Sequence, residues 1–228
     1  MSRVPGWLSE RFIEVTFFFE LGLAFVGFAL GAIALGDPLP FEMRIDGSAF
    51  LVALPATAPL LLGAAFLSSP VGRKIPALER IYGLLRDILE PAVLRMNALE
   101  IFVIAGAAGV GEEILFRGVV QQILGLYAAS AVFGLLHFLT PTYFVLVTAM
   151  GLYLGWLQDS TGNLAVPIVV HWLYDAFAIA LLRRRFAREP EPEEGPGDEP
   201  EDEPEGEGGP PGRPEEGEPP ERPGEGPP

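Results

Sequence analysis

Long apolar stretches constrain this chain more than any other feature of its sequence. The hydrocarbon core of a bilayer is about 30 Å thick, so a helix needs about 20 mostly apolar residues to cross it. Six stretches meet or approach that requirement, at about residues 15–35, 49–67, 98–124, 127–139, 143–157 and 164–182. Because a helix satisfies its own backbone groups in lipid, we predict an all-α, polytopic transmembrane helix bundle of about six spans.

A polar segment after the second apolar stretch is amphipathic. Its apolar residues recur at helical spacing: Leu78, Ile81, Tyr82, Leu85, Ile88 and Leu89. Charged residues fill the opposite side, which is typical of a helix lying along the membrane surface. We predict an interfacial helix here, ended by Pro91.

Basic residues set the predicted orientation. Arg73, Lys74, Arg80 and Arg86 follow the second stretch, and residues 183–185 are three consecutive arginines after the last one. Loops rich in Lys and Arg face the cytoplasm, so six spans place both termini on that side of a cell membrane. The first stretch is longer than the apolar region of a signal peptide, about 7–15 residues, so we expect it to remain as a span.

The C-terminal 42 residues have a different composition. Residues 187–228 hold 16 of the 30 acidic residues, 13 prolines and 9 glycines, and therefore most of the net charge of −15. Such a segment buries almost no apolar surface, so we predict a disordered tail after an integral membrane domain at residues 1–186. The body is nearly neutral and has no basic stripe, which argues against nucleic acid as a partner. The absence of cysteine excludes a catalytic thiolate and Cys-based metal sites.

Ionisable residues inside the apolar stretches are costly to insert and mark candidate functional groups. Glu112, Glu113 and Arg117 lie near the middle of the third stretch. Glu113 and Arg117 are four residues apart and are expected to form an ion pair. Glu112 has no such neighbour, and because two adjacent carboxylates share one cation, one of them needs a partner from another helix or a proton.

The two histidines of the chain also lie in apolar stretches. His137 follows Phe133 by four residues, and His171 precedes Asp175 by four, on one helix face. We expect these groups to converge with the glutamates on one polar pocket. A carboxylate and an imidazole can take a proton from water and return it to a leaving amine, and a second imidazole can stabilise an oxyanion. The set suits peptide-bond hydrolysis.

Three motifs in this order resemble the CPBP/Abi family of intramembrane proteases, which includes the CAAX prenyl endopeptidases. They are Glu112-Glu113-x-x-x-Arg117, Phe133-x-x-x-His137 and His171-x-x-x-Asp175. Gly118 and the Gly162-Asn163 turn are also similar to the family, and the resemblance covers about residues 98–182.

The resemblance implies an endopeptidase acting on a membrane-associated peptide or protein. It implies that Glu112 and His137 activate water and that Glu113 and Arg117 shape the site. His171 and Asp175 would stabilise the oxyanion, although the family often has Asn in place of Asp175, and a carboxylate donates a hydrogen bond only when protonated.

Two alternatives remain open at this point. His137, His171 and Glu112 are also a possible zinc ligand set, although the compact His-Glu-x-x-His signature is absent; we expect catalysis without a metal. A small transporter, channel or non-catalytic scaffold could use the same buried groups to bind protons or ions. The sequence names neither the substrate nor the oligomeric state.

Overall fold

The computed structural model describes residues 11–188, and this part of the chain contains helices and no strand. The predicted all-α class is confirmed. The elements are α2 (Phe12–Ala34), α3 (Gly47–Leu67), the 3-10 turn η1 (Gly72–Lys74), α4 (Pro76–Val93), α5 (Ala98–Leu115), the π-helical turn η2 (Phe116–Val120), α6 (Gln121–Leu124), α7 (Leu126–Leu136), α8 (Pro141–Thr161) and α9 (Ala165–Phe186). The predicted disordered tail lies, from residue 189 onward, outside the described residues.

Three helices, α2, α3 and α9, are long and apolar enough to cross a membrane. Large apolar side chains on them are exposed, among them Phe25 at 73% and Leu51 at 77%. A water-soluble protein rarely leaves such surfaces uncovered, so these faces suit lipid. Helix α7 has only 11 residues, about 16 Å, which is too short to cross alone. The count of six spans therefore stays a prediction.

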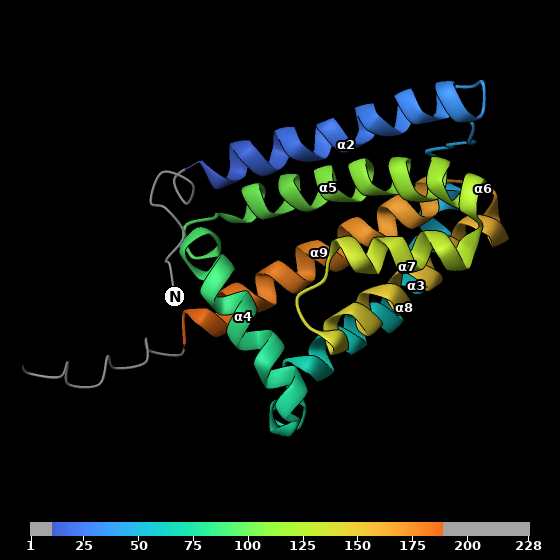
Figure 1. Ribbon diagram of the computed structural model, residues 1–228. Helices are drawn as coiled ribbons and strands as arrows, with labels where there is room; N and C mark the ends of the chain where they lie inside the picture. The colour runs from blue at the N-terminus through green and yellow to red at the C-terminus, as the bar shows by residue number, and fades with distance from the viewer. Residues whose placement is uncertain (1–10, 189–228) are drawn as a thin grey trace, which may run out of the picture. The chain divides into compact units, whose positions relative to one another are not determined.

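Helix α5 lies at the centre of the packing. Figure 1 shows α2 and α5 side by side, while α9 packs against both α5 and α3. Helices α7 and α8 pack on one another, and small apolar residues such as Ala53 and Ala165 let α3, α8 and α9 share one core. The six site residues predicted from the sequence lie on α5, on the η2 turn that follows it, at the end of α7 and on α9.

Helix α4 is the amphipathic element expected at the membrane surface, and Figure 1 shows it crossing near the C-terminal end of α9. Arg185 of α9 lies over the ring of Tyr82 and 3.4 Å from a carboxylate oxygen of Glu79. The prediction that Pro91 ends this helix is wrong, because the helix continues to Val93. Pro91 lies in the last turn, and the carbonyl of Glu90 beside it still accepts a hydrogen bond from the Leu94 amide.

The turn before α9 joins two distant parts of the chain. Gly162 adopts a left-handed conformation (φ 58°) that ends α8, which glycine does without strain. The Asn163 side chain then accepts a hydrogen bond from the Arg44 amide at 2.8 Å and donates one to the Arg44 carbonyl at 3.0 Å. The Gly162-Asn163 turn therefore fixes the α2–α3 loop against the start of α9.

That loop ends at Asp46, which caps α3. Its carboxylate accepts hydrogen bonds from the Ser48 side chain and from the Ser48 and Ala49 amides. These hydrogen bonds hold the pKa of Asp46 below its usual value. The bond from the Ser48 hydroxyl has the largest effect, and the bond from the Ala49 amide has the next largest. The start of the second apolar helix is thus fixed by local hydrogen bonds outside the apolar segment.

A glycine determines how closely α2 approaches α5. A Cβ atom at Gly111 would collide with the backbone carbonyl oxygen of Glu20 and lie 3.2 Å from its Oε2. The contact involves backbone atoms, so the helices cannot keep this spacing with any side chain at position 111. Small residues at such positions are typical of helix pairs in membranes.

We expect Gly111→Ala to lower the free energy of unfolding by about 1–3 kcal/mol, the usual cost of overpacking a core. The matched control is Gly22→Ala in α2, where an added Cβ meets nothing within 4 Å. Alanine is the better helix former, so the control should be neutral or stabilising by up to about 1 kcal/mol. Unfolding in mixed micelles measures both variants. Equal effects would show that the α2–α5 approach is not tight.

Candidate active site

The third apolar stretch carries two adjacent glutamates that face different surroundings. Consecutive residues of a helix point about 100° apart. Glu113 is fully buried in the protein, whereas the Glu112 side chain is 10% exposed and lines a cavity. The two carboxylates therefore occupy different layers of one site.

The inner layer is a buried ion pair. Arg117 Nη1 donates to Glu113 Oε1 at 2.9 Å, which confirms the pairing expected from their spacing. Arg117 Nη2 donates to the carbonyl of Gly151 at 3.1 Å, and the guanidinium lies 4.5 Å from the centroid of the Phe133 ring. Glu113 Oε1 also lies 2.9 Å from Nδ1 of His171. This layer links α5, η2, α8 and α9 and holds His171 in place.

Arg117 lies in a π-helical turn, which the sequence did not predict. In this turn the Gln121 amide donates to the carbonyl of Phe116, five residues earlier. Such single π turns occur inside α-helices and are frequent at functional sites. The predicted continuous helix over residues 98–124 is thus divided into α5, η2 and α6.

The outer layer surrounds Glu112. Its Oε1 lies 3.5 Å from His137 Nε2, and its Oε2 lies 3.8 Å from His171 Nε2. His171 Nε2 is also 3.4 Å from Asp175 Oδ2. The partner that Glu112 required is therefore supplied by two histidines from other segments, and all six predicted residues meet in one cluster.

In both histidines, the hydrogen bonds identify Nδ1 as the nitrogen that donates. A backbone carbonyl only accepts, so His137 Nδ1 carries a hydrogen that it donates to Phe133 at 2.9 Å. His171 Nδ1 donates to the Glu113 carboxylate, whose charge Arg117 stabilises. Both Nε2 atoms are therefore left facing Glu112, where they can exchange protons with it or with a bound water.

His137 is displaced from its predicted place in the helix. It caps the C-terminus of α7 with non-helical dihedrals (φ −97°, ψ 17°), because α7 ends at Leu136. Its side chain remains 34% exposed. This position at a helix end leaves the imidazole partly exposed on the wall of a cavity.

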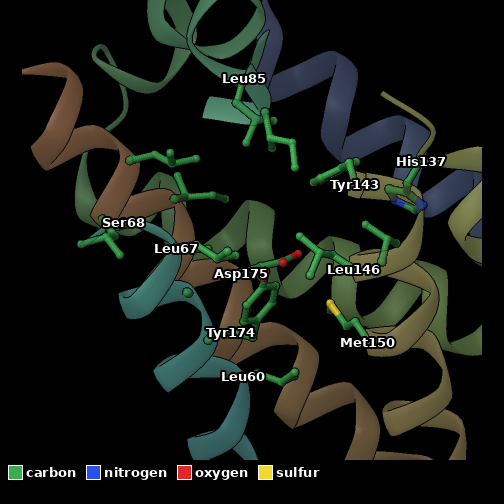
Figure 2. Close-up of a pocket in the computed structure, with 18 of the residues that line it drawn as sticks. Leu60, Leu67, Ser68, Leu85, His137, Tyr143, Leu146, Met150, Tyr174 and Asp175 are labelled. Atoms are coloured by element: carbon green, nitrogen blue, oxygen red, sulfur yellow. The ribbon is translucent and has the colours of Figure 1, made fainter. Parts of the chain in front are cut away.

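The cavity has a volume of about 520 Å³. Glu112, His137, His171 and Asp175 line one part of it, and Glu113 and Arg117 do not reach it. Figure 2 shows that most other side chains around this space are apolar, among them Leu60, Leu67, Leu85, Leu146 and Met150. A few convergent polar groups beside an otherwise apolar cavity are typical of a ligand or substrate site.

Sequence reasoning missed three polar residues near this cluster. Tyr143 and Tyr174 line the same cavity as the predicted residues. Glu20 of α2 is buried against Gly111, beside Glu112. The tyrosines had no distinguishing signal, but Glu20 is an ionisable residue inside a predicted span and the same rule that found Glu112 identifies it.

The geometry bears on the possible metal site. Within residues 11–188, no group of three or more His, Cys, Asp or Glu side chains is arranged to hold one metal ion. The alternative ligands His137, His171 and Glu112 are close neighbours, with both Nε2 atoms within 4 Å of the Glu112 carboxylate. Catalysis without a metal therefore stays a prediction.

Comparison with known proteins identifies the same segment. Residues 94–177 match a family described as Type II CAAX prenyl endopeptidase Rce1-like. The uncharacterized protein YpbD of Bacillus subtilis (strain 168) is 40% identical over 86 residues, which cover 36% of this chain and 46% of the relative. The matched part therefore spans about half of that relative's length, and no solved structure matches the chain. All six site residues lie within residues 94–177, and the resemblance to the CPBP family, with its CAAX endopeptidases, is confirmed over this segment.

Proposed function

We propose that this protein is an intramembrane endopeptidase that hydrolyses peptide bonds of membrane-associated proteins or peptides. The observation that supports it most is the placement of Glu112, His137, His171 and Asp175 together on the wall of an apolar cavity. Water-activating groups beside an apolar chamber suit a substrate that is itself partly apolar. The similarity of this segment to the CAAX endopeptidases points to the same chemistry.

Glu112 and His137 are the proposed water-activating pair. Their facing atoms, Oε1 and Nε2, are 3.5 Å apart, so one water molecule can contact both. The pair removes a proton from this water as its oxygen bonds to the carbonyl carbon of the substrate. The C–N bond then breaks, and the pair returns the proton to the leaving amine.

His171 and Asp175 are the proposed stabilisers of the oxyanion. Nδ1 of His171 already donates to Glu113, so Nε2 can donate to the oxyanion only when the ring is an imidazolium. Carboxylates of Glu112, Glu113 and Asp175 lie within 4 Å of its ring nitrogens and stabilise that charge. Asp175, which accepts rather than donates when ionised, acts through His171 in this arrangement.

We also propose that hydrolysis proceeds without a metal ion. The two histidines direct Nε2 at Glu112, which supports acid–base catalysis by these groups. A chelator should therefore leave the rate unchanged in a preparation that is active. Loss of activity with a chelator, restored by added zinc, would overturn this part of the proposal.

The second candidate, proton or ion transport, uses the same buried cluster. Ionisable groups are costly to place inside apolar helices, so their presence indicates a function, and proton or ion binding is one such function. The cavity lining argues for the protease, because most of the groups that surround it are apolar and would not solvate an ion along a path.

The deciding experiment uses the purified full-length chain in liposomes. We expect it to cleave some members of a library of membrane-associated peptides, with products identified by mass spectrometry. Proton and cation flux is measured on the same liposomes. Cleavage without flux supports the endopeptidase, whereas flux without cleavage by a folded protein would contradict it.

A further inference from the structure

A buried carboxyl group outside the six predicted residues lies next to the active site. Glu20 is 6% exposed, and the other buried residues of α2 are Gly27 and Gly31. It lies about 12 Å from the start of α2, within the apolar part of the helix. A charged group is rarely retained in such a position without a role.

The carboxyl group of Glu20 points at α5. A Cβ atom built on Gly111 would be 3.2 Å from Glu20 Oε2, so the carboxyl lies against the residue that precedes Glu112. Oε2 is buried and has no hydrogen-bond partner in the described part of the chain. Arg117, the arginine of the active-site cluster, is bonded to Glu113 and to Gly151. Within residues 11–188, no ion pair to Glu20 is observed.

The surroundings of Glu20 already contain several charges. Glu112 of α5, His171 and Asp175 of α9, and His137 at the end of α7 are close enough to act electrostatically on Glu20. A second carboxylate charge beside Glu112 would be uncompensated in a low-dielectric site, and one of two such neighbours keeps its proton. Two histidines lie within 4 Å of the Glu112 carboxylate, whereas in the described part of the chain no ion pair to Glu20 is observed, so the charge belongs on Glu112.

We propose that Glu20 is a positioning residue that remains a neutral carboxylic acid beside Glu112 and so reserves the negative charge for Glu112. This inference rests on the proposed function for its catalytic meaning. Loss of the Glu20 proton at high pH would add a negative charge near the oxyanion and slow the reaction. A glutamine at position 20 keeps the shape and stays neutral at every pH.

The first test does not need activity. Infrared spectra of the full-length protein in lipid, near neutral pH, should show the C=O band of a protonated carboxylic acid. Glu20→Gln should lose the intensity of one such group, and the matched control Glu14→Gln, at an exposed position of the same helix, should lose none. A wild-type spectrum without this band, or an unchanged band in Glu20→Gln, would overturn the proposal.

The second test measures kcat/KM against pH for the same three proteins. The alkaline limb of Glu20→Gln should move to higher pH, while Glu14→Gln should follow the wild type. A purely structural role would change the rate or the stability without moving this limb. If the protein cleaves no peptide at all, the proposed function fails while the infrared result still decides the protonation of Glu20.

Discussion

Glu112→Gln is expected to lower kcat/KM by about 10²–10⁴-fold, the usual contribution of a general acid–base group. The amide keeps the size of the side chain but cannot accept a proton from water. Glu112 lines the cavity, and among residues 11–188 its side chain makes no contact with a hydrogen-bonding group shorter than the 3.5 Å to His137, so its replacement should leave the fold intact. Single-turnover cleavage of an identified substrate measures the effect.

His137→Ala provides a second arm of this experiment. If both residues act on one water molecule, the double variant should be little worse than either single variant, since groups that act as a unit are not additive. Losses that multiply would show that the two residues act in separate steps. A Glu112→Gln enzyme as active as the wild type, with its fold verified by its unfolding transition, would remove Glu112 from the mechanism.

The part of the site that could be predicted is the part set by spacing along a single helix. The i,i+4 pairs Glu113–Arg117 and His171–Asp175 both occur as contacts, because residues four apart share a helix face. Charge balance alone indicated that one of the two adjacent glutamates needed a proton or a partner from another segment. The helical class followed from the apolar stretches.

Other features depended on contacts between segments that no spacing reveals. The second hydrogen bond of Glu113, from His171, joins residues 58 positions apart. The place of His137 at the end of α7 depends on where that helix stops, and helix ends are weakly encoded. The buried position of Glu20 depends on the close approach of α2 at Gly111.

Arg117→Met is expected to lower the free energy of unfolding by about 3–5 kcal/mol, the cost of leaving one partner of a buried ion pair without the other. Glu113 is fully buried, and its Oε2 already lacks a hydrogen-bond partner in the described structure. Without Arg117, His171 is the remaining charged partner of Glu113 among residues 11–188. The variant should also lose the contact of the guanidinium with Gly151, which joins η2 to α8.

The double variant Arg117→Met, Glu113→Gln separates charge from packing. Removing both charges eliminates the uncompensated carboxylate, so the double variant should be more stable than Arg117→Met alone, although methionine still cannot bond to Gly151. The surface control is Arg44→Met in the α2–α3 loop, whose pair with Glu42 is exposed at 61% and 72%. Its loss should be much smaller, because ion pairs nearer the surface contribute about 1 kcal/mol or less. Equal destabilisation by the single and double variants would mean that Arg117 stabilises the protein through packing on Phe133 and hydrogen bonding to Gly151, and that Glu113 is neutral in the folded state.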